Sequence, residues 1–256
     1  MKKLTINNRK GQGIVVVVSE VKKAKGLAIL MHGLSGNKEQ PYIVTIADAF
    51  QEKGYTTLRF DTTNTFGESD GRYEDATVTS YFYDLEDVIA WSKTQSWFVY
   101  PFILVGHSLG GISVILYAEK HPEDIKALAP ISSVISGKLS LESPMYRDIW
   151  DQWKKTGWRE QKRSSVLGRI KRLPWSHMVN RLEYDVLKDV QLLTMPVLLV
   201  VGENDEGTPY EHQKLFYDKL TGKKEIHLIK NAPHTFTQSS HLEKLREIFL
   251  KWIDTT

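Results

Sequence analysis

Short apolar runs alternate along this chain with stretches in which apolar residues recur every three or four positions. The runs are typical of strands buried in a parallel sheet, and the recurring stretches are typical of helices that cover such a sheet. We therefore expect a mostly parallel sheet with helices on both faces. The charged segment 20–25, between the first two runs, is expected to form a hairpin turn. The expected strands are 14–18, 27–31, 56–60, 102–105, 125–131, 197–201 and 225–229, and the expected helices are 41–53, 78–94, 112–121 and 242–252.

One stretch, residues 136–185, interrupts this alternation. It shows no strand pattern, it carries eleven Lys and Arg against six Asp and Glu, and it holds four of the seven tryptophans. Its position between two strands predicts a mostly helical cap, inserted into a core domain made of residues 1–135 and 186–256. The alternative is a solvated surface excursion that its tryptophans anchor. The two are compatible, because a cap must dock on the core and also expose a polar outer face, and we expect this one to line a pocket.

Composition narrows the class of protein. A chain of 256 residues with 41% hydrophobic and 25% charged residues is ordinary for one globular α/β domain with a large core. The net charge of +3 is too small to indicate nucleic acid or a membrane as the main partner. The absence of cysteine excludes disulfides, thiol catalysis and thiolate metal sites. The N-terminus has the charges of a signal peptide without its apolar core, and no run is long enough to span a bilayer. We therefore expect a cytoplasmic protein without stable membrane insertion, and its oligomeric state stays open.

The segment Gly-His-Ser-Leu-Gly-Gly at 106–111 follows an expected strand and precedes an expected helix. In that context Gly-x-Ser-x-Gly forms a tight turn that exposes the serine hydroxyl, and both flanking residues must be small to avoid neighbouring backbone. We interpret Ser108 as a nucleophile. The alternative is a glycine-rich turn in which Ser108 is an ordinary helix N-cap.

A serine nucleophile needs a base, and the base needs an acid that orients it. In sheets of this type, functional residues lie on loops beyond the carboxyl ends of the strands. His234 is the one histidine of eight in a loop just past the last expected strand, although a lone loop histidine is more often a surface residue. Asp205 lies a few residues beyond the strand 197–201 and competes there with Glu203 and Glu206. The order Ser108, Asp205, His234 is that of one known arrangement of the triad.

Attack on a carbonyl develops negative charge on its oxygen, and preorganised N–H donors must meet that charge. Leu109, the first residue after the serine, offers a backbone N–H at the start of a helix. The loop after strand 27–31 offers a second donor at Leu34, where Gly33 permits a close turn. The alternative for this loop is a glycine-rich turn without a chemical role.

The His32-Gly33 pair, the Gly-His-Ser-Leu-Gly-Gly segment, Asp205 and His234 together resemble the α/β-hydrolase superfamily over essentially the whole chain. The segments 32–38 and 60–71 are similar to those of small bacterial esterases that include the cinnamoyl (feruloyl) esterases. One departure is that loop 61–71 is one residue longer than usual, with Asn64 or Thr65 where relatives carry a first glycine. The resemblance implies a mostly parallel eight-stranded sheet, a triad of Ser108, Asp205 and His234, and oxyanion donation by Leu34 and Leu109.

These features predict a serine carboxylesterase for esters of small or aromatic, including hydroxycinnamic, acids. We expect no cofactor and no metal, since the chain has no His-Glu-x-x-His motif and no cysteine. Substrate contacts are expected from His32, Met145, Trp150 and Trp153, with flat apolar walls from the tryptophans. Arginines of the cap are expected to contact a polar or anionic alcohol portion of the substrate. Monoacylglycerol lipase, thioesterase and acyltransferase activity use the same machinery and stay open. A catalytically silent binding protein of the same fold is a further alternative.

Overall fold

The computed structural model describes residues 1–162 and 170–256, and its centre is a sheet of eight strands in the order β1-β2-β4-β3-β5-β6-β9-β10. Only β2 runs antiparallel to its neighbours β1 and β4, and every other adjacent pair is parallel. The predicted eight-stranded, mostly parallel sheet is therefore confirmed. The strands are β1 Lys2–Asn7, β2 Gly13–Ser19, β3 Leu27–Met31, β4 Thr56–Phe60, β5 Phe102–His107, β6 Ile125–Ile131, β9 Val197–Asn204 and β10 Lys224–Pro233.

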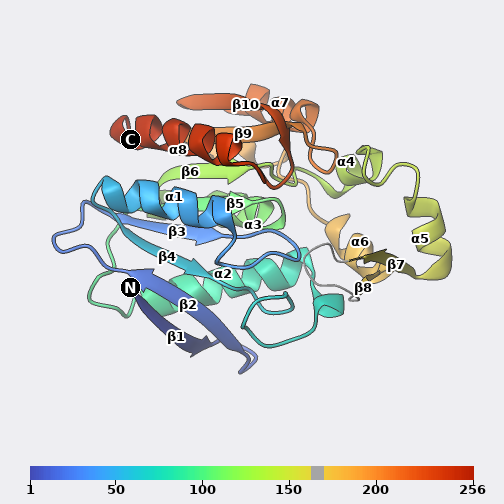
Figure 1. Ribbon diagram of the computed structural model, residues 1–256, viewed down its shortest axis with the longest axis horizontal. Helices are drawn as coiled ribbons and strands as arrows, with labels where there is room; N and C mark the ends of the chain where they lie inside the picture. The colour runs from blue at the N-terminus through green and yellow to red at the C-terminus, as the bar shows by residue number, and fades with distance from the viewer. Residues whose placement is uncertain (163–169) are drawn as a thin grey trace.

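Helices cover both faces of this sheet, as Figure 1 shows. Side chains of α1 and α8 form one buried apolar cluster with one face of the strands, and side chains of α2, α3 and α7 form another with the opposite face. Strands β2 to β5 are buried along their whole length, which explains why they appear in the sequence as unbroken apolar runs. The helices are α1 Pro41–Glu52, α2 Val78–Ser92, α3 Leu109–Lys120, α4 Gly137–Glu142, α5 Trp150–Thr156, α6 Trp175–Arg181, α7 Tyr210–Lys219 and α8 Ser239–Asp254, with single 3-10 turns η1 Tyr73–Asp75, η2 Pro122–Asp124 and η3 Val190–Leu192.

Two details of the sheet differ from the prediction. The segment 20–25 is not a hairpin turn, because β4 lies between β2 and β3 and pairs with both. The strand β1 was not predicted, since its alternating exposed and half-buried side chains leave no apolar run in the sequence. A strand at the edge of a sheet needs only one buried face, and its pattern is correspondingly weak.

The described residues between β6 and β9 contribute no strand to the central sheet. It forms α4, α5 and α6 and a separate antiparallel pair, β7 Trp158–Lys162 and β8 Ile170–Pro174, beyond the carboxyl ends of the parallel strands (Figure 1). The expectation of a mostly helical insertion missed this hairpin, because its strands are rich in Arg, Lys and Gln, and not in β-branched residues. Residues 163–169 of the predicted cap lie outside the described residues.

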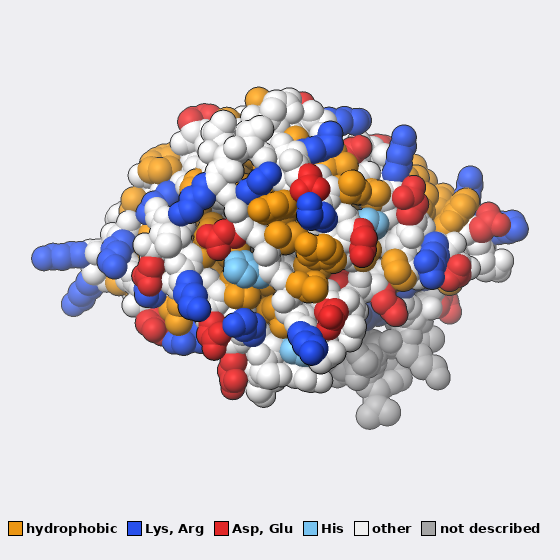
Figure 2. All heavy atoms as spheres, turned by 90° about the horizontal axis from the view of Figure 1, so that it is seen from above, with side chains coloured by type: hydrophobic (Ala, Val, Ile, Leu, Met, Phe, Trp, Pro, Cys, Tyr) orange, Lys and Arg blue, Asp and Glu red, His pale blue; other side chains and the backbone are white. Residues whose placement is uncertain are grey.

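The outer surface carries charges of both signs. Figure 2 looks down on the molecule from the side of β10 and α8, where Lys and Arg side chains lie interspersed with Asp and Glu. Within residues 1–162 and 170–256, none of the helices combines the length and apolar character needed to cross a bilayer.

Candidate active site

Ser108 lies at the sharp turn between β5 and α3. Its backbone has φ 55° and ψ −112°, a left-handed conformation that costs a non-glycine residue about 1–3 kcal/mol. Its side chain makes no capping hydrogen bond to α3, although it occupies the N-cap position. The hydroxyl lies instead 2.9 Å from Nε2 of His234. The turn therefore holds this hydroxyl away from its own helix, which disfavours the N-cap interpretation.

The two flanking glycines permit this turn because neighbouring backbone approaches each of them closely. A Cβ at Gly106 would lie 2.3 Å from the carbonyl oxygen of Gly110, and a Cβ at Gly110 would lie 2.5 Å from that of His32. Both contacts are with main-chain atoms, which rotation of a side chain cannot relieve. The requirement for small flanking residues thus has a steric cause in this fold.

Three side chains from three loops meet at this point. His234 begins the loop after β10, and its Nε2 faces the Ser108 hydroxyl. Its Nδ1 lies 2.8 Å from Oδ2 of Asp205, which directly follows β9. The Asp205 side chain is fully buried, whereas that of His234 is 23% exposed. The structure thus brings together the three residues that the sequence singled out, in one continuous chain of hydrogen bonds.

Asp205 is distinguished from its acidic neighbours by its surroundings. Oδ1 of Asp205 accepts hydrogen bonds from the backbone N–H groups of Gly207 and Thr208 at 3.0 and 2.9 Å. Burial by itself would raise the pKa of this carboxyl, but the charge of His234 and these hydrogen bonds lower the pKa well below its usual range. Glu206 is exposed, and Glu203 accepts a hydrogen bond from the N–H of Asn231. Neither glutamate contacts the imidazole.

The two expected oxyanion donors flank the serine. The carbonyl of Gly33 accepts hydrogen bonds from Nδ1 of His32 at 2.8 Å and from the Tyr81 hydroxyl at 3.3 Å. Because a trans peptide is planar, the N–H of Leu34 in the same peptide must point the opposite way, and Leu34 lines the cavity beside Ser108. The N–H of Leu109 is the first of α3, and within the described residues neither N–H donates a hydrogen bond.

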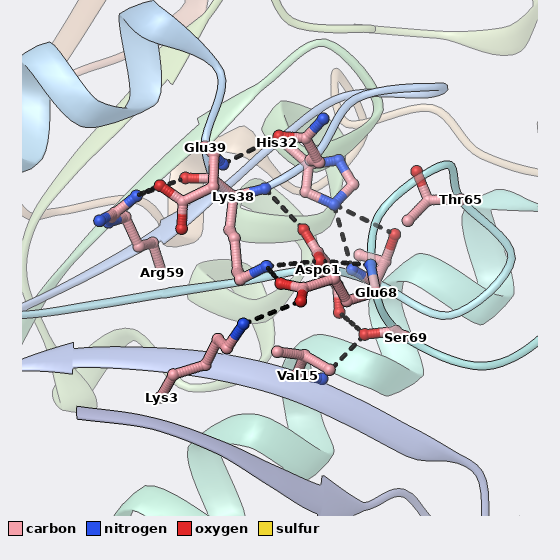
Figure 3. A network of polar contacts seen from close by, with 12 residues as sticks. Lys3, Val15, His32, Lys38, Glu39, Arg59, Asp61, Thr65, Glu68 and Ser69 are labelled. Atoms are coloured by element: carbon pink, nitrogen blue, oxygen red, sulfur yellow. Dashed lines mark hydrogen bonds and ion pairs between the residues drawn. The ribbon is translucent and has the colours of Figure 1, made fainter.

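A buried ion pair stabilises the loop that carries Leu34 (Figure 3). The ammonium of Lys38 lies 2.9 Å from Oδ2 of Asp61, and the two side chains are 2% and 0% exposed. Oδ1 of Asp61 also accepts the backbone N–H of Lys38 at 2.6 Å, and the Thr65 hydroxyl donates to the carbonyl of Gly36 at 2.6 Å. These contacts fix the loop that carries Leu34 on its C-terminal side, at Gly36 and Lys38.

A second histidine, His107, holds the loop of His234 in place. Nε2 of His107 donates to the carbonyl of His234 at 2.8 Å, and its Nδ1 lies 3.1 Å from the Tyr42 hydroxyl. Burial, together with the neighbouring His234, lowers the pKa of His107 to about 3, so that its imidazole is neutral. This supporting role was not predicted. The position of His107 inside the glycine-serine motif was the available signal.

A cavity of about 270 Å³ opens beside Ser108 and His234. Met145 is at its wall, as expected, with its methyl group next to Gly207. His32, Trp150 and Trp153 are not among the described residues that line it. His32 is fully buried and accepts the N–H of Thr62 on its Nε2, so its contacts are structural.

The tryptophan walls expected for this cavity do not form. Trp153 is 2% exposed, belongs to the small apolar cluster inside the cap, and donates its indole N–H to the carbonyl of Leu173 at 3.0 Å. The apolar surface of a tryptophan favours burial as much as substrate contact, and composition alone does not separate the two.

The described residues of η1 and of the inserted segment that line the cavity are mainly aromatic hydroxyls and cations, with one amide. They come from η1, the loop before α5, the β7–β8 hairpin and the end of α6: Tyr73, Tyr146, Arg159, Gln161, Lys171 and Arg181. Contacts from arginines of the cap were expected, but the sequence did not identify which arginines or the tyrosines beside them. In residues 1–162 and 170–256, no group of three or more His, Asp or Glu side chains is arranged to hold a metal ion.

Comparisons with known proteins agree with this geometry. A family model described as the alpha/beta hydrolase fold matches residues 29–156, which is half of the chain. A structure of Est1E from Butyrivibrio proteoclasticus with ferulic acid bound is 25% identical, superimposes with a TM-score of 0.78, and is covered over 98% of both chains.

Two curated relatives have similar identities. The mouse palmitoyl-protein thioesterase ABHD10, a mitochondrial protein, is 25% identical over 85% of this chain and 71% of its own length. An uncharacterised 31.7 kDa protein of Escherichia coli is 25% identical over 88% of this chain and 89% of its own.

Proposed function

The chain belongs to the α/β-hydrolase fold family, and from that premise we propose that it is a serine hydrolase of carboxylic esters. The observation that carries the proposal is the hydrogen-bonded series from Ser108 through His234 to Asp205. The proposed substrates are esters of small or aromatic acids, including hydroxycinnamic acids. The likeness to Est1E with ferulic acid bound and the compact cavity of about 270 Å³ support this choice.

In the proposed reaction, the Ser108 oxygen bonds to the ester carbonyl carbon while its proton passes to Nε2 of His234. The carbonyl oxygen, now an anion, accepts hydrogen bonds from the N–H groups of Leu34 and Leu109. Collapse of this intermediate breaks the bond to the alcohol oxygen, which takes the proton from His234. Asp205 keeps the imidazole in the tautomer that can accept and return a proton.

The acyl group is then linked to Ser108 as an ester. A water molecule gives one proton to His234 and its oxygen bonds to the acyl carbon. The second collapse breaks the bond to Ser108, which regains the proton from His234, and the acid leaves. All steps use the same two N–H donors, so no second oxyanion site is required.

We also propose that residues 136–185 act as a cap on a core formed by residues 1–135 and 186–256. The cavity walls support this division, because Met145, Tyr146 and Arg159 face Ser108 from the inserted segment while Leu34 and Thr235 face it from the core. Substrate would then bind between the two parts.

Thioester hydrolysis is the second candidate, and the relationship to the palmitoyl-protein thioesterase ABHD10 favours it. The same residues would act, with a thiol leaving in place of an alcohol. The small cavity favours short or compact acyl groups over a long alkyl chain in either case.

The test is hydrolysis of 4-nitrophenyl acetate, methyl ferulate and acetyl thioesters by purified protein, with Ser108→Ala as the matched variant. We expect turnover, a covalent adduct with a fluorophosphonate on Ser108, and a loss of at least about 10³-fold in kcat for the variant with unchanged thermal unfolding. Absence of both turnover and adduct would favour the silent binding protein. Comparison of the oxygen and sulfur esters decides between esterase and thioesterase.

A further inference from the structure

Part of the wall of the cavity beside Ser108 is cationic. Arg159, Lys171 and Arg181 line it, and no Asp or Glu is among the described residues that do so. Most ligand sites in proteins have apolar walls with a few placed polar groups, so three cations on one side are informative.

Arg181 is the most unusual of the three because its charge is buried without a carboxylate. The residue is 4% exposed, and its Nε has no hydrogen-bond partner among the described residues. Its Nη2 donates to Nε2 of His177 at 2.9 Å, while Nδ1 of His177 donates to the carbonyl of Ala76 at 2.7 Å. His177 is therefore the neutral tautomer, and the guanidinium forms no ion pair with any described residue. Burying a charge without a counter-ion costs free energy unless a bound anion pairs with it.

The β7–β8 hairpin adds cations to the same wall through its register. Arg159 lies opposite Leu173 and Gln161 lies opposite Lys171, so these four side chains share one face of the hairpin. That face is directed at the cavity and at the buried cluster of the cap.

The opposite face of the hairpin carries an ion pair in its described part. Glu160 lies opposite Arg172, with 2.9 Å between the carboxylate and Nε, and Arg172 stacks 4.4 Å from the ring of Trp158. The one acidic residue of the described part of the hairpin is thus directed away from the cavity.

Both guanidinium groups lie close to the same aromatic ring of the wall. Arg159 lies 4.8 Å and Arg181 lies 5.6 Å from the centre of the Tyr146 ring, which itself lines the cavity. A guanidinium presents a planar set of donors that matches the two oxygens of a carboxylate or phosphate. Two of them beside one cavity wall form a receptor for such a group.

We propose that this hydrolase acts on esters that carry an anionic group, a carboxylate or a phosphate, which Arg159 and Arg181 bind in the cavity beside Ser108. The inference rests on the proposed function, since it identifies the substrate class of the same site. The anion pairs with the buried guanidinium of Arg181 and orients the ester toward the Ser108 hydroxyl.

Two matched pairs of esters test the proposal and separate the part of the substrate that carries the charge. Mono-4-nitrophenyl glutarate against its neutral methyl ester places the anion on the acyl side. 1-Acetylglycerol 3-phosphate against 1-acetylglycerol places it on the alcohol side. We expect the anionic member of at least one pair to have a kcat/KM about 10- to 100-fold higher, as charge-assisted hydrogen bonds imply. Ratios at or below one in both pairs would overturn the proposal.

Variants of the hairpin locate the effect. Arg159→Gln should bring the ratio in the preferred pair down to near one, whereas Arg172→Gln, on the outer face of the same hairpin, should keep it. Arg181→Lys retains the charge of a buried residue but loses the planar donor set, so the ratio should fall while the protein stays folded by circular dichroism. An equal ratio in wild type and Arg159→Gln would contradict the assignment.

Binding to the Ser108→Ala variant separates this inference from the proposed function. Titration calorimetry with mono-4-nitrophenyl glutarate and with its methyl ester, and with the two acetylglycerols, requires no turnover. Tighter binding of an anionic member would support the anion site even in a protein that hydrolyses no ester. Turnover of neutral esters together with equal binding within both pairs would leave the hydrolase and exclude the anion site.

Discussion

Replacement of Lys38 by Met tests whether the buried ion pair below the oxyanion loop stabilises the fold. The ammonium of Lys38 and the carboxylate of Asp61 are 2.9 Å apart and almost fully buried (Figure 3). Methionine keeps most of the length of the side chain and removes the charge. Asp61 then retains the backbone N–H groups of Lys38 and Glu68 but no cation within its buried surroundings.

The expected cost follows from leaving a buried carboxylate without its partner. Breaking such a pair destabilises a protein by about 3–5 kcal/mol, a large part of the about 5–15 kcal/mol that separates a folded domain from its unfolded state. For a chain of this size, that loss lowers the Tm by about 6–20 °C. The turn that carries Leu34 should also loosen, so the kcat for 4-nitrophenyl acetate should fall.

Urea unfolding at pH 7 measures this loss, and Lys3→Met provides the matched control. Lys3 pairs with Glu68 on the surface, where the side chains are 58% and 52% exposed, so its removal should change the stability much less than the loss of Lys38 does. Adding Asp61→Asn to Lys38→Met should recover part of the stability, because the buried group is then neutral. An equal effect of the two lysine substitutions, or no recovery in the double variant, would refute the reasoning.

Three further predictions concern the triad, the tight turn and a buried acid. Asp205→Asn should reduce kcat for 4-nitrophenyl butyrate on the order of 10³- to 10⁴-fold with little change in KM, because the amide no longer selects the required tautomer of His234. A loss of kcat below 10-fold would contradict the orienting role of Asp205. Gly106→Ala should prevent folding to the native state, seen as loss of near-UV circular dichroism, since the new Cβ meets main-chain atoms at 2.3 and 2.6 Å; a native-like spectrum would show that the backbone can yield. Burial, with Asp189 and Asp185 nearby, raises the pKa of Glu119 to about 8. The folded state therefore binds one more proton than the unfolded state between about pH 4.5 and 8. Its stability falls as the pH rises through this range, by at most about 1.4 kcal/mol per pH unit. Glu119→Gln should flatten the dependence of urea unfolding on pH over that range, and parallel curves for the two proteins would exclude this contribution.

The α/β-hydrolase fold and the resemblance to small bacterial esterases, both expected from the sequence, are confirmed by the family match and by the likeness to Est1E. The sequence could carry this information because each element leaves a local pattern. The central strands are buried on both faces and the elbow needs its glycines at fixed positions around Ser108. The catalytic roles of Ser108, Asp205 and His234 remain predictions that the geometry supports.

What the sequence could not predict depends on contacts between distant segments. The role of His32 follows from a carbonyl that it shares with Tyr81, and the burial of Lys38 follows from a partner 23 residues away. Trp153 was expected at the cavity but lies in the cap's apolar cluster, beside Leu173 of the β7–β8 hairpin. The expectation was wrong because this hairpin has no recognisable strand pattern in the sequence. Asn64 shows the opposite case. Asn64 or Thr65 was expected where relatives carry a glycine, and Asn64 adopts φ 60°, a conformation that asparagine tolerates better than most other residues.

Three unfavourable local features of the described residues lie at one cavity or next to the loop that lines it. Ser108 has a strained backbone, Lys38 and Asp61 bury a charge pair, and Arg181 buries a charge without a carboxylate. Elsewhere in the sheet, local preference and fold agree, as the fully buried apolar strands show. Sequences that fold well are consistent at every level except where function requires otherwise, so this clustering is itself an argument for placing the chemistry at Ser108. The same clustering is an argument that the anion bound by Arg159 and Arg181 is part of the substrate. A structural anion would have been supplied by an Asp or Glu of the cap, and the one acidic residue in the described part of the hairpin, Glu160, pairs on the outer face instead.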